Sequence, residues 1–375
     1  MSSIFYFYRR SSMRQDLIRG ALRDQGASYL LYGLNHLDLH GFTATHNLAT
    51  ESAAIEPQGR LAGWINRLAL GLGGVGGDVQ TVLTHRRRAN RSDLILSTVD
   101  TVGIPLVFFK WPGLIRRPLV YVSIGLPERI QTITAHGIQR IYRNAFQHVD
   151  RFIAYGWEEA LWIRRWMELP EDSPKVVFMP FGVDSDYFSP RPENIQSVDV
   201  LTIGADPQRD YKTLFWIASR HPRVTFRVIA SKDLAAGFTS VPGNVEILVD
   251  IPFPEIRDHL ATARVVALPI HENTYSAGTT TLLQAMAMAR PVVVSNTGAI
   301  RKGYELEDGL NCRLVPPGDQ AVFESALMTL LDDVDAATRI GLAARNTIET
   351  HLTWPLFENR LFNILKQALP SPESS

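Results

Sequence analysis

The segment "ARVVALPIHENTYSAGTTTLLQAMAMARPVVVS", residues 263–295, constrains the fold more than any other part of the chain. It begins with Ala263–Ile270 and ends with "VVVS", two short valine-rich runs that are typical of strands buried on both faces. Between them, Thr281–Ala289 consists of good helix formers and is apolar nearly all round, which predicts a buried helix. Pro291 ends that helix. The order strand, loop, helix, strand predicts a parallel β-sheet.

The same alternation runs through the first half of the chain. Strands are expected at "IFYFY", "FTATHNL", "DLILST", "PLVYVSIGL", "RFIAYG" and "KVVFMPFG". Helices are expected at Tyr29–His40, "VQTVLTHRRR", about Glu128–His148 and "EEALWIRRWMEL", and "IPLVFFKWPGLI" is expected to be a loop at a strand edge. Strands that alternate with helices indicate a parallel sheet covered on both faces.

The length of 375 residues favours two domains of ordinary size. The segment Phe181–Ser197 is rich in proline, glycine, serine and aspartate and predicts an interdomain linker, after which the alternation restarts. We therefore expect an α/β fold with two doubly wound, Rossmann-like domains, residues 1–190 and 191–355, facing a central cleft. Residues 356–375 are expected to form a C-terminal helix that can pack back on the first domain, followed by a disordered tail.

Composition excludes several classes of protein. Lys plus Arg equals Asp plus Glu at 38 each, so charge gives no case for nucleic acid as the main partner. The single cysteine, Cys312, excludes an internal disulfide, fits a reducing compartment and is expected to be a small buried hydrophobe. No apolar run is long enough to span a membrane, so we expect a cytoplasmic protein. Trp111 with Arg116 and Arg117 allows peripheral contact with the inner face of a membrane, an alternative to an ordinary loop.

The loop "HENTYSAGTT" would lie at the carboxyl end of a parallel strand, where such sheets bind ligands. The free N–H groups and the positive dipole end of the following helix suit an anion, above all a phosphate. The residues expected to line this ligand site are His271, Glu272, Tyr275, Ser276, Ala277, Gly278, Thr279 and Thr280. Gln284, one turn further along the apolar helix, is a buried amide that needs partners, either in the neighbouring strand or on ligand hydroxyls such as a ribose.

A second anion-binding feature is "IGADPQRDYKTL" at the start of the second domain. Gly204 would make the turn after a strand, and a helix would begin near Asp210. Arg209, with its forked donors, and Lys212, with its point charge, would then reach a diphosphate held at the first feature.

Three other motifs leave alternatives open. The loop Gly71–Asp78 is a weak dinucleotide fingerprint, so it is either a flexible acceptor-side loop or a plain turn, and its role stays open. His36 and His40 are four residues apart, but the glutamate of the hydrolytic zinc motif and a third ligand are missing, so we expect no metal site. "THRRRANR" is expected to be a basic helix end in solvent, with a polyanion or lipid phosphate as the alternative partner.

The stretches "QAMAMARPVVVS" and "EDGLNCRLVPPGD" resemble the signature of glycosyltransferase family 4, glycosyl transferases group 1, with the GT-B fold. "VVFMPFGVDSDYFSP" looks like the domain junction of that family. The two glutamates of the family signature fall here on Ser276 and Gln284, and Ala205 stands where an arginine often follows the glycine. In the first domain, "VSIGL" replaces the usual His-Gly pair. The resemblance implies transfer with retention at the anomeric carbon.

These features together predict a glycosyltransferase that moves a sugar from a UDP- or GDP-sugar to an acceptor hydroxyl. Arg209, Lys212 and the N–H groups near Gly278–Thr280 would stabilise the leaving diphosphate without a metal or other cofactor, and Glu272 would contact the sugar. An inverting reaction would need a base, for which Asp100 is the candidate. Asp100, Ser123 and Gly125 are expected on the acceptor side, where a saccharide, a lipid-linked or a small-molecule acceptor would bind. A sugar-nucleotide epimerase and a non-catalytic nucleotide-sugar-binding module are the alternatives.

Overall fold

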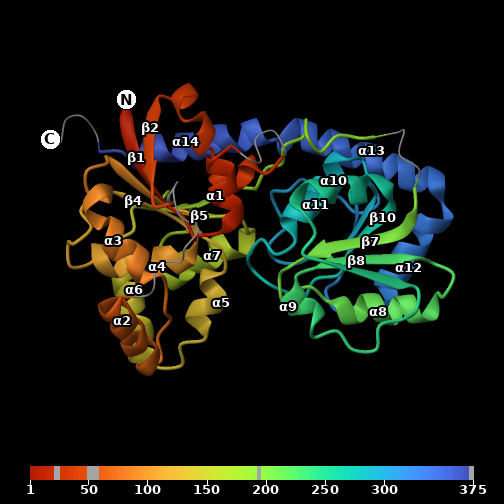
Figure 1. The fold of residues 1–375 in the computed structure, drawn as a ribbon, viewed down its shortest axis with the longest axis horizontal. Helices are drawn as coiled ribbons and strands as arrows, with labels where there is room; N and C mark the ends of the chain where they lie inside the picture. Colours follow the sequence, from red (N-terminus) through yellow and green to blue (C-terminus); the bar gives the residue numbers. More distant parts are fainter. Residues whose placement is uncertain (21–25, 49–58, 192–195, 371–375) are drawn as a thin grey trace. The chain divides into compact units, whose positions relative to one another are not determined.

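The computed structural model describes residues 1–20, 26–48, 59–191 and 196–370. The chain divides into two compact units: residues 1–23, 30–179 and 358–375 form the first, and residues 24–29 and 180–357 form the second. Each unit contains a six-stranded parallel sheet flanked by helices (Figure 1). The expected fold class, two parallel α/β domains, is therefore confirmed. The main part of the second unit begins at residue 180 and ends at residue 357, whereas the sequence predicts boundaries at 190 and 355.

The sheet of the first unit has the strand order β2-β1-β3-β4-β5-β6, and all its pairs are parallel. Its strands are β1 Ser2–Phe7, β2 Phe42–His46, β3 Leu94–Ser97, β4 Leu119–Ser123, β5 Arg151–Ala154 and β6 Val176–Phe178. All residues of β3 and β4 are buried, as the apolar runs predict for strands covered on both faces.

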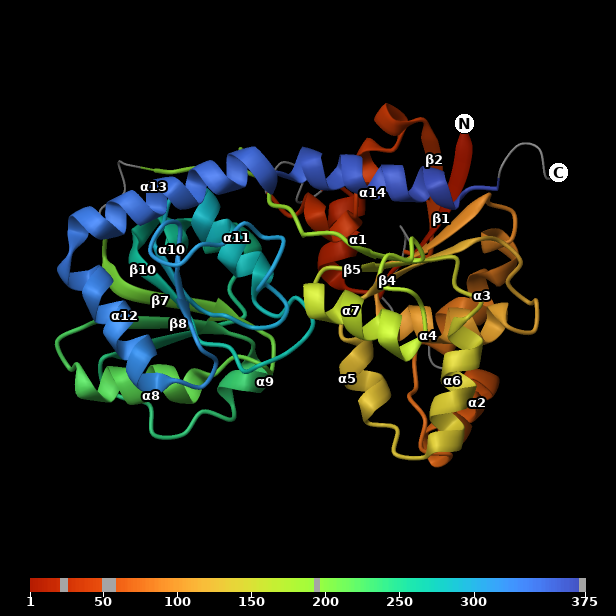
Figure 2. The same ribbon diagram turned by 180° about the vertical axis from the view of Figure 1, so that it is seen from behind.

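The α-helices of the first unit are α1 Ser12–Ile18, α2 Arg60–Gly71, α3 Val79–Ala89, α4 Asp100–Lys110, α5 Leu126–Gln131, α6 His136–Phe146 and α7 Trp157–Trp166. The last helix of the chain, α14 Trp354–Ala368, begins in the second unit and continues along the first. Figures 1 and 2 show α3, α4 and α6 below the first sheet and α14 above it.

The predicted helix at Tyr29–His40 is wrong. The segment forms three short 3-10 turns, η1 Ser28–Leu31, η2 Leu34–His36 and η3 Asp38–His40. Tyr32 and Gly33 have φ angles of 51° and 75°, in the left-handed region, which interrupts an α-helix after its first turn. Gly41, with φ 81°, ends the segment.

Two further predictions in the first unit are corrected. The long helix predicted at Glu128–His148 is two helices, α5 and α6, separated by the segment 132–135. The loop predicted at 104–115 begins instead inside α4, which contains Pro105. Because Pro105 has no N–H, the carbonyl of Thr101 lacks its helical partner, and it accepts a 2.6 Å hydrogen bond from the N–H of Asp78.

The sheet of the second unit has the order β12-β11-β10-β7-β8-β9. Its strands are β7 Val198–Gly204, β8 Phe226–Ala230, β9 Val245–Val249, β10 Ala263–Leu268, β11 Val292–Ser295 and β12 Arg313–Val315. Its helices are α8 Tyr211–Arg220, α9 Lys232–Ala235, α10 Phe253–Thr262, α11 Thr279–Ala287, α12 Gln320–Asp332 and α13 Val334–His351. The buried helix predicted at Thr281–Ala289 is α11, which begins and ends two residues earlier.

The C-terminal helix is anchored to the first unit by Phe362. This side chain is 1% exposed. Its ring stacks on His40 with centroids 4.0 Å apart and also lies against Phe42. A Cβ on Gly33 would meet the ring of Phe362 at 2.9 Å, so the turn closes tightly over it. One turn earlier on α14, Glu358 accepts a 2.8 Å hydrogen bond from His36 Nδ1.

Replacing Phe362 by alanine should destabilise the first unit. Removing a fully buried phenylalanine ring is expected to lower the free energy of unfolding by about 3 to 5 kcal/mol. Urea unfolding monitored by circular dichroism measures the loss. L342A, at a position on α13 that is 61% exposed, is the control and should change stability little. Equal stability of F362A and L342A would show that α14 is not anchored through this ring.

Candidate functional site

The two segments predicted as anion-binding features lie against each other at the carboxyl edge of the second sheet. They follow β7 and β10, which are neighbouring parallel strands. The N–H of His271 donates to the carbonyl of Gln208 at 2.9 Å, and the N–H of Asp210 donates to that of Pro269 at 2.9 Å. These bonds flank a bridge between Arg209 and Ile270. The loop after one strand therefore fixes the loop after the other.

Arg209 is a buried cation with unused hydrogen-bond donors. Its side chain is 7% exposed. Nη2 donates to Oγ1 of Thr281 at 3.2 Å, whereas Nε and Nη1 have no hydrogen-bond partner among the described residues. Burial lowers the pKa of Arg209, and Tyr211 and Asp206 offset part of that effect. A buried charge with free donors is costly unless an anion binds it, so this guanidinium is a candidate anion-binding group.

Two glycines leave room for the guanidinium. A Cβ on Gly204 would overlap Nε of Arg209. Gly278 has a φ of 75°, and a Cβ there would lie 3.1 Å from Nη1 of Arg209 and 2.5 Å from Cδ1 of Ile270. The guanidinium therefore lies between the turn after β7 and the turn that begins α11. Only glycine fits at either position without displacing it.

The first turn of α11 adds further donors beside Arg209. Gly278 is its N-cap and has no capping side chain. The hydroxyl of Thr279 is buried and has no hydrogen-bond partner among the described residues. The N–H of Thr279 donates to the carbonyl of Ser276 at 3.3 Å. The remaining N–H groups of the helix N-terminus, an unused hydroxyl and an unused guanidinium together are well suited to a phosphate group.

The remaining predicted residues of this edge occupy varied positions. Tyr275 donates its hydroxyl to both carboxylate oxygens of Asp206, at 2.8 and 2.9 Å, which ties the loop after β10 to the loop after β7. Ala277 and Gln284 are buried, Ser276 and Thr280 are half-buried, and His271 and Lys212 are exposed. Lys212 lies on the first turn of α8, two residues after the N-cap Asp210.

Glu272 is held by the loop that follows β11. Its Oε1 accepts from the N–H of Gly298 at 2.7 Å, and its Oε2 lies 3.3 Å from Nη2 of Arg301. Its side chain is 56% exposed, so the fixed carboxylate remains accessible.

Next to Glu272, the structure shows polar groups that sequence reasoning missed. Asn273 Oδ1, Asn296 Oδ1 and Thr297 Oγ1 are buried and have no hydrogen-bond partner among the described residues. Buried polar atoms are normally satisfied, so unsatisfied ones at a sheet edge indicate ligand contacts. The available signal was the dipeptide Asn296-Thr297 directly after the buried strand β11, at the same edge as the loop after β10.

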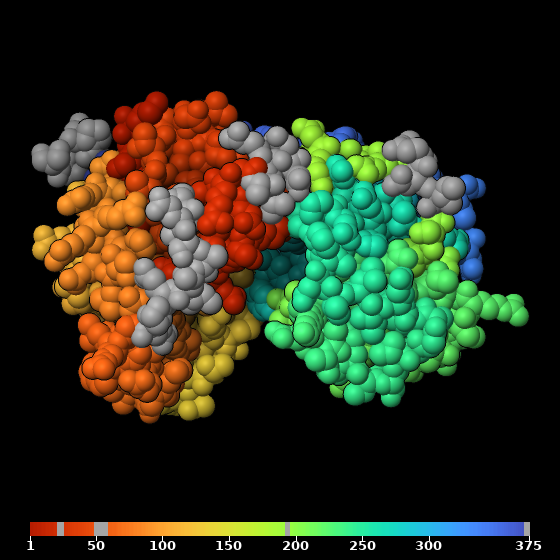
Figure 3. Space-filling view, in the orientation of Figure 1, coloured from red at the N-terminus to blue at the C-terminus, as the bar shows by residue number. Residues whose placement is uncertain are grey.

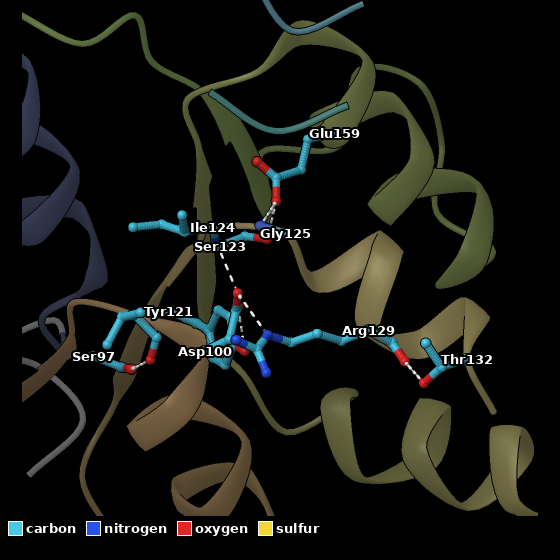
Figure 4. Close-up of polar contacts among 10 residues, drawn as sticks. Ser97, Asp100, Tyr121, Ser123, Ile124, Gly125, Arg129, Thr132 and Glu159 are labelled. Carbon is cyan, nitrogen blue, oxygen red and sulfur yellow. Dashed lines mark hydrogen bonds and ion pairs between the residues drawn. The ribbon is translucent and has the colours of Figure 1, made fainter. Parts of the chain in front are cut away.

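In the first unit, Asp100, Ser123 and Gly125 belong to one buried network (Figure 4). Asp100 is fully buried, accepts from the hydroxyl of Tyr121 at 2.7 Å and from the N–H of Ile124 at 3.2 Å, and lies 3.7 Å from Nε of Arg129. The predicted candidate base therefore has both carboxylate oxygens occupied and no exposed surface.

A second acid, Glu159, holds the other two residues and was not predicted. Oε1 of Glu159 accepts from the hydroxyl of Ser123 at 2.6 Å and from the N–H of Gly125 at 2.8 Å. Oε2 of Glu159 has no hydrogen-bond partner among the described residues. Gly125 has a φ of 87° and turns the chain from β4 into α5. Asp100 and Glu159 thus fix the same turn from two sides.

Burial raises the pKa of both acids. The pKa of Asp100 rises to about 6, with Tyr121 and Arg129 opposing the effect of burial. The pKa of Glu159 rises to about 8 because of burial and the neighbouring Asp100. A neutral carboxyl also tolerates an unpartnered buried oxygen better than a charged one does.

The other motifs are placed as follows. Among the described residues, no group of three or more His, Cys, Asp or Glu is arranged to hold a metal ion. The loop 71–78 is a turn between α2 and α3, held by Asn66 and by the Tyr142 hydroxyl.

Cys312 is a free thiol, and burial raises its pKa to about 12. Across the described ranges, no helix has the length and apolar character needed to cross a bilayer.

Comparison with known proteins agrees with this geometry. Residues 193–333 match the family model of glycosyl transferases group 1. The chain carries a glycosyl transferases group 1 domain. A D-inositol 3-phosphate glycosyltransferase of Kineococcus radiotolerans is 27% identical over 214 residues, which are 46% of this chain and 47% of that protein. The chain thus spans about half the length of this curated relative.

Solved structures share the fold of the whole chain. Anabaena HepE, in complex with UDP and glucose, is 17% identical with a TM-score of 0.68, covering 98% of this chain and 100% of that one. The sucrose-phosphate synthase of Thermosynechococcus elongatus is 14% identical with a TM-score of 0.72, covering 98% of this chain and 99% of that one. The chain therefore has the GT-B fold. The group 1 domain contains Arg209, Glu272 and α11, while the Asp100–Glu159 network lies outside it.

The free energy of unfolding should fall as pH rises, because Glu159 becomes ionised. Its folded pKa of about 8 lies above its ordinary value of 4.5, so the protonated form stabilises the fold below pH 4.5. That contribution is lost as pH rises to about 8. E159Q, which keeps the acceptor for Ser123 and Gly125 without a charge, should remove this part of the slope. Urea unfolding between pH 5 and 8 measures it, as differences on the order of a few kcal/mol.

A matched control for E159Q is E171Q, which changes an exposed acid of the same unit. E171Q should follow the wild-type pH profile. If E159Q followed it as well, Glu159 would be ionised in the folded protein, contrary to the raised pKa.

Proposed function

We propose that the chain is a glycosyltransferase of family 4 type that transfers a sugar from a nucleotide-sugar, a UDP-sugar in preference to a GDP-sugar, to an acceptor hydroxyl. The observation that carries this proposal is Arg209, a buried guanidinium with two unused nitrogens beside the N-terminus of α11. The group 1 domain around it supports the proposal. UDP is preferred as the nucleotide because Anabaena HepE was solved with UDP and with UDP-glucose.

In this reaction the bond between the anomeric carbon and the phosphate oxygen breaks, and negative charge develops on the leaving diphosphate. Arg209, the hydroxyl of Thr279 and the N–H groups of Gly278 and Thr280 stabilise that charge, with Lys212 as a second cation from α8. Because Arg209 and Thr279 are buried and held in place before the donor binds, they stabilise the transition state without reorganising. The step uses only groups of this chain and requires no metal ion.

The rest of the donor is bound along the same edge. Gln284, buried on α11, bonds a ribose hydroxyl. His271, Glu272 and the unsatisfied Asn273 and Thr297 bond the hydroxyls of the transferred sugar. The contact between Glu272 and Gly298 sets the position of the carboxylate. This arrangement compensates for Ser276, which stands where the family signature has a glutamate.

We further propose that the reaction retains the anomeric configuration. A phosphate oxygen of the leaving group then takes the proton of the acceptor hydroxyl as the new glycosidic bond forms. Asp100, the base that inversion would need, is 0% exposed and engaged by Tyr121, Ile124 and Arg129, which supports retention. Determining the anomeric configuration of the product by NMR distinguishes the two outcomes.

On the acceptor side, Asp100 and Glu159 hold the turn at Ser123–Gly125, and the acceptor binds next to this turn. A saccharide, a lipid-linked saccharide or a small molecule is compatible with such a site. We place the reaction in the cytoplasm, which agrees with the free, buried thiol of Cys312.

R209M tests the anion site directly. Methionine fills the space of Arg209 without its charge, so we expect the free energy of unfolding without ligand to be unchanged or raised. UDP at about 100 times its dissociation constant should stabilise the wild type by about 2.7 kcal/mol, and R209M should lose most of this gain. Thermal unfolding with and without UDP measures both. R339M, an exposed arginine of α13, should respond to UDP like the wild type. An unchanged UDP effect in R209M would contradict the assignment.

E272Q tests the sugar contact. Losing a charged hydrogen bond of about 1.5 to 3 kcal/mol should lower kcat/KM about 10- to 100-fold while UDP binding is retained. Mass spectrometry of products formed from UDP-glucose measures this. E349Q, which removes the exposed carboxylate paired with Arg345, is the control and should leave turnover unchanged.

The same assay separates glycosyl transfer from other chemistry. Free UDP with a glycosylated acceptor supports the proposal, and slow release of UDP and free glucose without acceptor agrees with it. A changed sugar still attached to UDP would instead indicate an epimerase. Binding without turnover would indicate a nucleotide-sugar-binding module.

A further inference from the structure

A strongly basic pocket lies in the first unit, away from the network of Asp100 and Glu159. Its lining includes Arg86 and Arg87 at the end of α3, and Arg116 and Arg117 after α4. No carboxylate belongs to the described lining of this pocket. Four cations converge here although the whole chain has equal numbers of basic and acidic residues.

Asn90 builds the pocket by joining the two segments. Its Nδ2 donates to the carbonyl of Leu114 at 2.8 Å, and its Oδ1 accepts from the N–H of Arg116 at 2.9 Å. The carbonyl of Asn90 accepts from Nε of Arg117 at 3.0 Å. The arginines are thus held close together by the backbone, despite their mutual repulsion.

Exposed apolar side chains adjoin these arginines. Leu114 lines the basic pocket and is 46% exposed, and Trp111, three residues earlier, is 42% exposed. The ring of Trp111 lies 6.4 Å from that of Phe108. Phe108 in turn lines a second pocket of about 230 Å³ between α2, α4 and α6, with an almost entirely apolar lining. The end of α4 therefore lines the apolar pocket through Phe108 and leads, along the chain, to the segment that lines the basic pocket.

Helix α2 continues this surface. Leu61, Trp64 and Leu68 are spaced at i, i+3 and i+7 and are 59%, 56% and 47% exposed, so α2 turns an apolar stripe outward. The charged residues of α2 are two arginines, Arg60 and Arg67, and it has no acidic residue. Figures 1 and 2 show α2 beside α6 at the end of the first unit, and Figure 3 shows α2, in orange, at the molecular surface.

We propose that this surface, consisting of α2, the end of α3 and the segment 111–117, docks on a bilayer of anionic lipids. The arginine pocket binds lipid phosphate groups, while Trp64, Trp111 and the leucines of α2 insert at the level of the headgroups. An apolar stripe flanked by arginines is what an interfacial helix needs, and arginines alone or leucines alone would bind a membrane weakly. This docking does not depend on the proposed transfer reaction.

The docking is tested with the full-length protein and sedimented vesicles. Vesicles of phosphatidylcholine with about 30% phosphatidylglycerol should bind the protein, whereas phosphatidylcholine alone should bind it far less. Salt should weaken the binding only in part, since the inserted apolar groups are not screened. Failure to bind the anionic vesicles at low salt would overturn the proposal.

Two pairs of variants separate the contributions. R87Q/R116Q should weaken binding about 25-fold, at about 5-fold for each arginine near an anionic surface. The control R223Q/R339Q removes the same charge from exposed positions of the second unit and should bind like the wild type. If both double variants lost vesicle binding equally, the effect would come from net charge alone, and the proposed arginine site would be overturned.

The apolar stripe has its own matched pair. L61S, at a position that is 59% exposed, should weaken binding about 10-fold, whereas L342S, at 61% exposure on α13, should leave it unchanged. The arginines and leucines replaced in these variants are exposed. Thermal unfolding of every variant should therefore match that of the wild type. If the variants L61S and W64S both bound the anionic vesicles as tightly as the wild type does, α2 would not insert into the bilayer.

Discussion

The site in the second unit depends on a buried guanidinium that the protein itself leaves incompletely bonded. Arg209 lies between Gly204 and Gly278, where a side chain on either glycine would displace it. Among the residues that the structure describes, its side chain donates a hydrogen bond only to the neutral hydroxyl of Thr281. A buried cation without a counterion lowers stability, so the surrounding sheet and helices must hold it in place. The diphosphate that we propose as ligand would supply the missing negative charge.

The loops around Arg209 are rigid for a common reason. The loop after β10 is tied to the loop after β7 through Tyr275 and Asp206, and to the loop after β11 through Glu272 and Gly298. Three strands that are neighbours in one sheet thus present three loops that hold one another. Such mutual support fixes the positions of the loops that carry the unsatisfied groups of Asn273 and Thr297.

The first unit contains the opposite electrostatic arrangement at its sheet edge. Asp100 and Glu159 are buried acids that burial pushes toward the neutral form, and they grip the turn Ser123–Gly125 from two sides. Its outer surface is basic instead, around Asn90. The zero net charge of the chain therefore conceals a strong local separation of charge, which composition alone does not reveal.

The sequence by itself determined the two parallel sheets, because valine-rich strands and helix-forming segments have distinct local patterns. It also determined that Arg209 and the N-terminus of α11 follow neighbouring strand ends. Local patterns did not determine the 3-10 turns near Gly33 or the break between α5 and α6, since backbone angles there depend on packing. Local patterns also missed that α4 contains Pro105, where the N–H of Asp78 bonds the carbonyl of Thr101 that the proline leaves free.

Only the tertiary structure decided the contacts between distant residues. Glu159 meets Ser123 across 36 positions, and Glu272 meets Gly298 across 26. No local pattern predicts such pairs, because they follow from strand order. Burial likewise converted Asp100 from an apparent free base into a bonded, fully enclosed acid. Residue type sets what a side chain can do, and its neighbours in space set which of those possibilities is realised.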